Sequence, residues 1–122
     1  MDLELLPAEL AICRLDPGVP FPSWVRGDLI AVVRTSEELS VVCDAGALPE
    51  GLDCSRGWRA VRVAGTMDLS LTGVLAKLLA PLAEAEVPIF AVSSFDTDYV
   101  LVRGERLEQA RAALEAAGHR LG

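Results

Sequence analysis

A strand-turn-strand pattern occurs twice in this chain of 122 residues, and it limits the fold more than any other feature. Residues 31–43 and 90–102 superpose without a gap in their order of apolar and polar residues, and Glu37 then falls on Asp96. A chain of this length holds one compact domain, or two very small ones that share a core. The pattern predicts two related halves in one folding unit, and the alternative is a chance similarity between two hairpins.

The second half of the chain predicts the element order β-α-β-β-α-β. Strands are expected at residues 58–64, 87–93, 98–103 and 119–121. Leucine and valine recur at helical spacing over residues 71–82, where Pro81 should kink or end the helix. A second helix is expected over residues 105–117, before Gly118. This split order is typical of an antiparallel sheet with both helices on one face.

The first half repeats this order in shortened form. Residues 9–15 predict its first strand, a Pro-rich stretch at residues 17–24 stands where the long helix would be, and residues 44–48 allow only one helical turn. The predicted class is therefore α+β, with repeats at residues 1–57 and 58–122 and with both helices of the first repeat shortened.

Composition excludes several kinds of partner. The net charge of -7 opposes binding to nucleic acids and to anionic membrane surfaces. The apolar runs are far shorter than the roughly 20 residues that span a bilayer, and the acidic start of the sequence does not resemble a targeting signal. We expect a protein of the cytoplasm.

Three cysteines form an odd set without the spacing of a zinc site or a disulfide framework. Cys13 and Cys43 lie in apolar runs, where we expect them to pack as small hydrophobic side chains, and Cys54 is expected in a loop.

Enzyme signatures are missing from the sequence. No nucleophile elbow, P-loop, zinc-protease or dinucleotide-binding spacing occurs. The single histidine, His119, is expected to be a polar strand or capping residue, and the paired carboxylates lie in predicted solvent-facing positions. The sequence predicts neither an enzyme nor a bound cofactor or metal.

Several segments of the second half resemble the ACT domain of aspartate kinases and related regulators. These are Leu71-Thr72-Gly73-Val74-Leu75-Ala76, Leu82-Ala83-Glu84-Ala85 and Ile89-Phe90-Ala91-Val92-Ser93-Ser94. The run from Ser93 to Val102 is similar to small free-standing tandem-ACT proteins of bacteria and to the C-terminal ACT unit of the arginine-sensing CASTOR proteins. The resemblance implies ferredoxin-like βαββαβ repeats, pairing into a homodimer, and a free amino acid bound at a domain interface. Many ACT domains have Pro-Gly where this chain has Thr72-Gly73.

A binding site for a free amino acid is predicted at the joint of the two repeats. The helix start at residues 70–73 offers unpaired N–H groups to a carboxylate, and an aspartate offers an acceptor to an ammonium group. The predicted contact residues are Asp68, Leu71, Thr72, Gly73, Ser94, Phe95, Asp96, Thr97 and Asp98, with Glu38, Leu39 and Ser40 closing the pocket from the first repeat.

Other roles remain open for some of these residues. Asp68 is also a helix-capping group, and Asp96 and Thr97 are ordinary turn residues. Asp98 heads an apolar strand and needs a partner, which is a ligand or an internal arginine such as Arg34 or Arg59. The alternative function is a ligand-free interaction or oligomerisation module with an unidentified protein effector.

Overall fold

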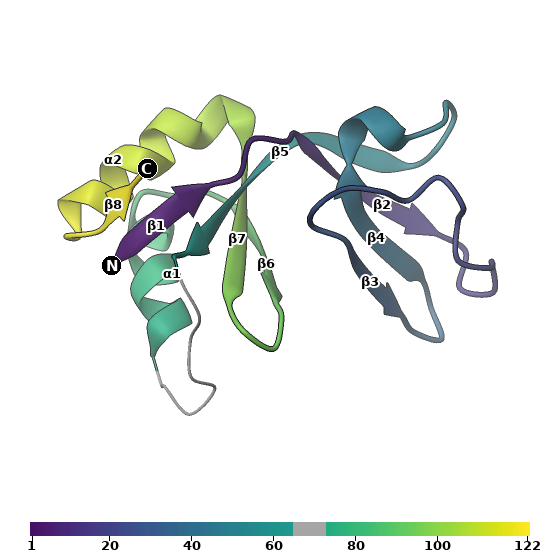
Figure 1. Cartoon of the computed structure of the whole chain (residues 1–122), viewed down its shortest axis with the longest axis horizontal. Coiled ribbons are helices and arrows are strands. Elements are labelled where there is room, and N and C mark those ends of the chain that lie inside the picture. The colour runs from purple at the N-terminus through teal and green to yellow at the C-terminus, as the bar shows by residue number, and fades with distance from the viewer. Residues whose placement is uncertain (65–72) are drawn as a thin grey trace. The chain divides into compact units, whose positions relative to one another are not determined.

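The computed structural model describes residues 1–64 and 73–122, which form two compact units (Figure 1). The N-terminal unit is Ala8–Trp58, and the C-terminal unit combines Met1–Pro7 with Arg59–Gly122. Strand β5 (Cys54–Val63) runs through the boundary and contributes to both units. The sequence division at residue 57 thus falls inside a strand, and Met1–Pro7 lies with the second half instead of the first.

The elements of the described residues alternate as expected for an α+β fold. In chain order they are β1 (Asp2–Leu5), β2 (Leu10–Leu15), β3 (Ala31–Arg34), β4 (Leu39–Asp44), the 3₁₀ turn η1 (Ala45–Ala47), β5, α1 (Val74–Glu84), β6 (Ile89–Ser93), β7 (Asp98–Arg103), η2 (Gly104–Arg106), α2 (Leu107–Ala116) and β8 (Arg120–Leu121). No helix in the described part of the chain is long and apolar enough to cross a membrane.

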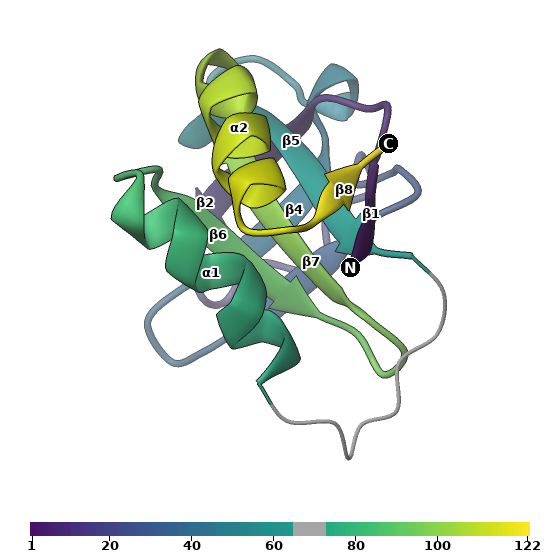
Figure 2. The ribbon, with the colours of Figure 1, turned by 90° about the vertical axis from the view of Figure 1, so that its left-hand side faces the viewer.

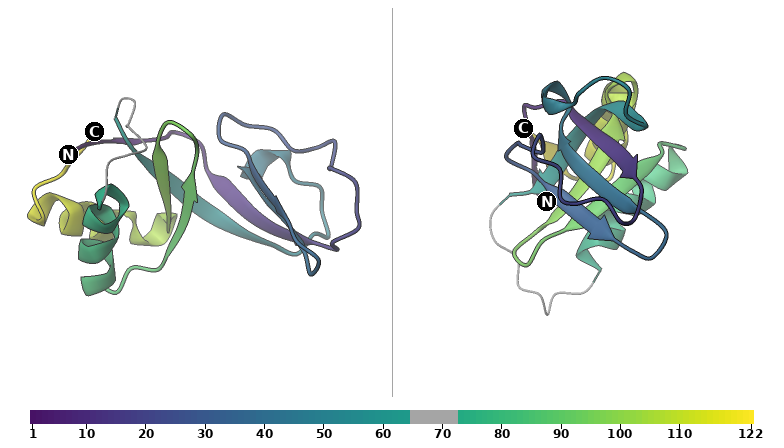
Figure 3. Two further views of the ribbon diagram at one scale, coloured as in Figure 1. Left: turned by 90° about the horizontal axis from the view of Figure 1, so that it is seen from below. Right: turned by 90° about the vertical axis from the view of Figure 1, so that its right-hand side faces the viewer.

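The N-terminal unit is an antiparallel sheet in the order β3-β4-β2-β5, which can be followed in Figure 3. Its core comes from alternate residues of β2 and β4 and from the start of η1: Ala11, Cys13, Leu39, Val41, Cys43 and Ala45. Trp24 and Val25, from the long segment between β2 and β3, pack against this core. Within Ala8–Trp58 the only helical element is η1, which confirms the shortened helices of the first repeat.

A disulfide joins two strands of the N-terminal unit, and it corrects the interpretation of the cysteines. Cys13 and Cys54 lie directly opposite each other on β2 and β5, and their sulfur atoms are bonded. Cys54 therefore belongs to a strand and not to a loop, and only the buried Cys43 is a free thiol. Sequence spacing did not predict this pair because opposite positions on two strands can be far apart along the chain.

The C-terminal unit carries both helices on one face of its sheet (Figure 2). Strand β7 pairs with β5 and β6, and β1 lies between β5, to which it is antiparallel, and β8, to which it is parallel. Alternate strand residues such as Leu3, Val61 and Val100 meet Leu82 of α1 and Leu114 of α2 in one buried core. This arrangement is the ferredoxin-like fold that the sequence predicted.

The sequence predicted that Pro81 would kink or end its helix. It does not end helix α1, which continues to Glu84. Proline has no N–H group, so the carbonyl of Lys77 loses the donor that residue 81 normally supplies. The buried imidazole of His119 replaces that donor, because its Nε2 lies 3.1 Å from the Lys77 carbonyl oxygen. The single histidine therefore has a structural role, with its proton on Nε2.

The two hairpins β3–β4 and β6–β7 have matching registers, which confirms their overlay in the sequence. Ala31 pairs with Val42 as Phe90 pairs with Leu101, and Arg34 pairs with Leu39 as Ser93 pairs with Asp98. All four pairs of the first hairpin have their counterpart in the second where the gapless overlay places it.

Candidate functional site

The turn between β6 and β7 is held by its own polar groups. The backbone N–H of Ser94 donates to the carbonyl of Thr97 at 2.9 Å, and the Ser94 hydroxyl lies 3.2 Å from both the N–H and the carbonyl oxygen of Thr97. The Thr97 side chain is 8% exposed, and its hydroxyl donates to the carbonyl of Val63 at the end of β5. Ser94 and Thr97 thus have structural roles that need no ligand.

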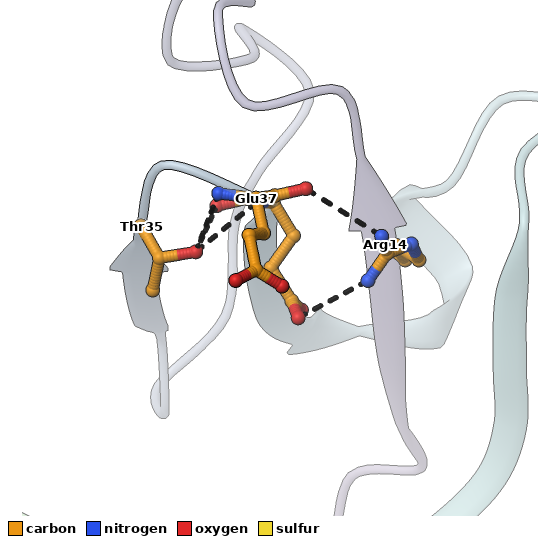
Figure 4. A network of polar contacts seen from close by, with 4 residues as sticks. Arg14, Thr35 and Glu37 are labelled. Atoms are coloured by element: carbon orange, nitrogen blue, oxygen red, sulfur yellow. Dashed lines mark hydrogen bonds and ion pairs between the residues drawn. The ribbon is translucent and has the colours of Figure 1, made fainter.

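The turn between β3 and β4 repeats this construction at the matching positions (Figure 4). The N–H of Thr35 donates to the carbonyl of Glu38 at 2.9 Å, and the Thr35 hydroxyl accepts the N–H groups of Glu37 and Glu38, each at 3.1 Å. A hydroxyl residue that begins the turn therefore closes both hairpins in the same way.

Asp98 begins β7 on the same side of the strand as Val100, which is buried under the helices. The Ser93 hydroxyl, directly across the hairpin, donates to Asp98 Oδ1 at 2.5 Å. Arg34 donates instead to carbonyl oxygens of its own unit, and Arg59 donates to the carbonyl of Leu6. Within the described residues Asp98 therefore has a neutral partner, not the internal arginine that was the alternative to a ligand.

Ser93 is the residue that sequence reasoning missed at this site. It ends β6, a strand of half-buried and exposed residues, and occupies the position that Arg34 has in the other hairpin. The pairing of strand ends across a short turn is the signal that would have placed it opposite Asp98.

Helix α1 begins at the same end of the C-terminal unit as the β6–β7 turn, as Figures 1 and 2 both show. Gly73 is the N-cap, with a left-handed backbone (φ 75°) and no side chain to cover the first N–H groups of the helix. The first N–H groups of a helix have no partner within it and form the positive end of its dipole. Asp68, Leu71 and Thr72 lie outside the described residues.

The candidates from the first repeat are engaged within their own unit. Glu38 forms an ion pair of 3.1 Å with Arg14, which also reaches the carbonyl of Glu37 (Figure 4). Leu39 is fully buried in the core and is therefore a packing residue. Ser40 lies opposite Arg14 on β2 and is half-buried.

Phe95 and Asp96 form the tip of the β6–β7 turn and are both exposed. Phe95 is 78% exposed, so packing against the described residues does not explain this aromatic side chain. No group of three or more histidine, cysteine, aspartate or glutamate residues in the described part of the chain could hold a metal ion.

Each of the two units matches a model of a known protein family. The ACT-domain family model matches residues 53–116, and a second model, described only as an N-terminal domain, matches residues 8–51. No curated protein matches the chain. A crystal structure of a protein from Agobacterium tumefaciens is 33% identical, with a TM-score of 0.93 over 99% of this chain and 91% of that one.

Two further structures share the fold at lower identity. A Vibrio cholerae protein of unknown function is 23% identical with a TM-score of 0.77, over 95% of this chain and 88% of that one. The regulatory subunit of aspartate kinase from Thermus thermophilus, in a ligand-free form, is 16% identical with a TM-score of 0.65, over 91% of this chain and 93% of that one.

Proposed function

Because the chain belongs to the ACT-domain family, we propose that it is a non-catalytic regulatory module that binds a free amino acid where its two ACT repeats meet. Residues of the C-terminal unit hold the ligand. Binding of the amino acid changes the affinity of the protein for a second copy of itself or for an effector. This requires only that the free and the associated protein bind the amino acid with different affinities.

The observation that carries this proposal is the pairing of opposite polarities at one end of the C-terminal unit. The start of α1 at Gly73 offers N–H groups to a carboxylate, and Asp98, which heads β7, offers a carboxylate to an ammonium group. Within the described residues the Asp98 side chain is bonded only to the Ser93 hydroxyl, and it forms no ion pair there. An α-amino acid carries both complementary groups.

The test is a titration of the protein with each of the twenty amino acids, followed by thermal unfolding. A ligand at 100 times its dissociation constant stabilises the folded state by about 2.7 kcal/mol, which raises the midpoint by several degrees. Asp98→Asn should abolish the shift for the amino acid that produces it. Asp16→Asn is the control, since Asp16 is an exposed aspartate outside the predicted contact residues. A full shift in Asp98→Asn would place the site elsewhere.

A second candidate function is self-association, and one observation favours it. Strand β3 is at the edge of the N-terminal sheet and, within the described residues, pairs only with β4. Ile30, Val32 and Val33, in and beside this strand, are all exposed, with Val33 at 58%. An unpaired apolar edge strand is a template for pairing with a second chain.

Light scattering after size-exclusion chromatography tests this alternative. If β3 joins two copies, Val33→Lys yields a monomer, because it places a charge on the edge that pairs. Phe21→Lys is the control, since Phe21 is equally exposed in the same unit but outside the strand. A dimer that survives Val33→Lys, or a wild-type monomer, excludes this edge as the interface.

A further inference from the structure

The three cysteines of the chain lie on one face of the N-terminal sheet. Cys13 of β2 is bonded to Cys54, which stands directly opposite it on β5. Cys43 lies on the other side of β2, on β4, where it pairs with Ala11, two positions along β2 from Cys13. Residues two positions apart on a strand point to the same face of a sheet. One disulfide and one free thiol therefore share a small apolar core.

Strand β5 is joined to β2 by only a short ladder near the disulfide. Arg56 and Gly57 together stand opposite the single residue Ala11, which makes a β-bulge, and Gly57 has a left-handed backbone (φ 82°) that favours glycine. Beyond the bulge, the residues of β5 that pair with β2 are Ser55 and Cys54, whereas β2 and β4 pair over six consecutive positions without a shift. The start of β5 thus has less backbone pairing than β2 and β4 have with each other, and the disulfide crosslinks it.

The ladder nevertheless places the two cysteines side by side. The N–H of Arg14 donates to the carbonyl of Asp53 at 3.0 Å, one position beyond the cysteines. Hydrogen-bonded and non-hydrogen-bonded pairs alternate along an antiparallel ladder, so Cys13 and Cys54 form a non-hydrogen-bonded pair, the kind whose side chains lie closer together. When the disulfide is broken, closure of this ladder brings the same two thiols together again. The bond therefore forms again without a rearrangement of the fold.

The two cysteines of the disulfide differ in exposure. Cys13 is 1% exposed, whereas Cys54 is half-buried and is the first residue of β5, the last strand in the order β3-β4-β2-β5. A thiol from solution therefore reaches Cys54 first, and attack on a disulfide requires such access. Cys43 is fully buried, and burial raises the pKa of its thiol, so Cys43 stays protonated at neutral pH and does not attack the disulfide from inside.

We propose that the Cys13–Cys54 disulfide is a reversible redox switch, which a dithiol reductant opens at Cys54 and whose reduction releases the start of β5 from β2. A thiolate of the reductant bonds to the Cys54 sulfur, the Cys13–Cys54 bond breaks, and Cys13 leaves with the electron pair and takes up a proton. The second thiol of the reductant then displaces Cys54, which also takes up a proton. The reductant ends as a disulfide, and the protein has gained two electrons and two protons.

The switch goes beyond the function proposed above and does not depend on it, because each residue that forms it belongs to the N-terminal unit. A permanent crosslink is the other role open to this disulfide. Disulfides of that kind are found in oxidising compartments, whereas those of the cytosol are usually transient and redox-sensing. We expect this protein in the cytoplasm, which favours the switch, and reduction by glutathione decides between the two roles.

Titration of the wild-type protein with mixtures of reduced and oxidised glutathione tests the switch, with the disulfide content measured by mass spectrometry after alkylation of free thiols. The bond should be intact in the most oxidising mixtures, lost in the most reducing ones, and restored when the mixture is reversed. Cys43→Ala should give the same curve, because Cys43 takes no part in the exchange. A disulfide that persists in the most reducing mixture is a permanent crosslink and refutes the proposal.

Amide hydrogen exchange on the same samples measures the structural consequence. Reduction should make the amides of residues 53–57 exchange about tenfold faster or more, because the crosslink no longer prevents local opening. The amides of β3, β4 and α2 should change little. Equal exchange of residues 53–57 in the two states would refute the release of β5.

Two variants with a single cysteine each test where the disulfide is attacked. Cys13→Ala with Cys43→Ala leaves only Cys54, and Cys54→Ala with Cys43→Ala leaves only Cys13. Oxidised glutathione should form a mixed disulfide with Cys54 about tenfold faster than with Cys13, because Cys13 is buried. Equal rates in folded samples of both variants would contradict attack at Cys54.

Discussion

The two units share a hairpin but differ in how the sheet around it is covered. In the C-terminal unit, α1 and α2 supply the buried side chains that face β5 and β7. In the N-terminal unit the corresponding cover comes from the segment between β2 and β3, with Trp24 and Val25, and from the disulfide between β2 and β5. One hairpin geometry is therefore compatible with two different ways of closing a small core.

The hairpins themselves differ in what their matching positions do. The turn hydroxyls of Thr35 and Ser94 have the same role, whereas the facing strand ends are Arg34 with Leu39 in one hairpin and Ser93 with Asp98 in the other. The two hairpins thus share their turn hydrogen bonds and strand pairing, and they differ in the side chains that face each other at the strand ends.

Loss of the disulfide should have the largest effect and should act on one unit. The chain-entropy model assigns about 4 kcal/mol to a crosslink that closes a loop of this length, the two cysteines being 41 residues apart. The Cys13→Ser/Cys54→Ser double variant should therefore lose the amide dispersion of residues 8–58 at lower temperature than that of α2. Reductant should reproduce this in the wild type and leave the double variant unchanged. Equal melting of both units in the reduced protein would contradict the comparison.

Truncation of a core side chain in α2 should instead destabilise the C-terminal unit first. Leu114→Ala removes a side chain that is 1% exposed from α2, and such changes cost about 3 kcal/mol. Signals of β6, β7 and α2 should be lost first on heating, while the disulfide-linked strands persist. Leu107→Ala, a partly buried position of the same helix, should cost less.

His119 and Pro81 should be coupled, because one compensates for the other. His119→Ala leaves the Lys77 carbonyl without a donor, which we expect to cost about 2 kcal/mol. In the Pro81→Ala background residue 81 regains an N–H group, so the same substitution should cost less than half as much. Urea unfolding of the four proteins in this cycle measures the coupling, and additive effects would show that His119 does not replace the missing donor.

The two turn hydroxyls should contribute equally. Thr35→Ala and Ser94→Ala each remove hydrogen bonds at matching positions, and each should cost about 1 kcal/mol in urea unfolding. A cost confined to Ser94 would mean that the likeness of the hairpins does not extend to their energetics.

The smallest effect at neutral pH concerns Cys43, which matches Val102 of the other hairpin. Burial raises the pKa of the Cys43 thiol, although the backbone N–H of Arg26 acts in the opposite sense. The unfolded chain therefore loses this proton first, and stability should fall as the pH rises above the ordinary thiol value toward the raised one. Urea midpoints of the wild type should decline relative to Cys43→Ala between pH 7 and about pH 9.5, roughly the range around the free thiol pKa. A difference in urea midpoint between the two proteins that stays constant over this pH range would refute the prediction.

Much of the fold could be predicted because it depends on local patterns. The shared order of apolar and polar residues marked the hairpins, the leucine spacing marked α1, and Gly118, with its φ of 95°, ends α2 as expected. The short strand β1 was missed because four residues carry too little pattern. The candidate site was predicted less well: Glu38 and Leu39 belong to an ion pair and a core, and Ser93 was overlooked.

The sequence by itself determined the repeated strand-turn-strand segments and the absence of common catalytic motifs, because these depend on residues close together in the chain. Only the tertiary structure decided which distant groups meet, such as Cys13 with Cys54 and His119 with the Lys77 carbonyl. Such contacts arise from strand pairing and packing across many residues, and no local pattern encodes them.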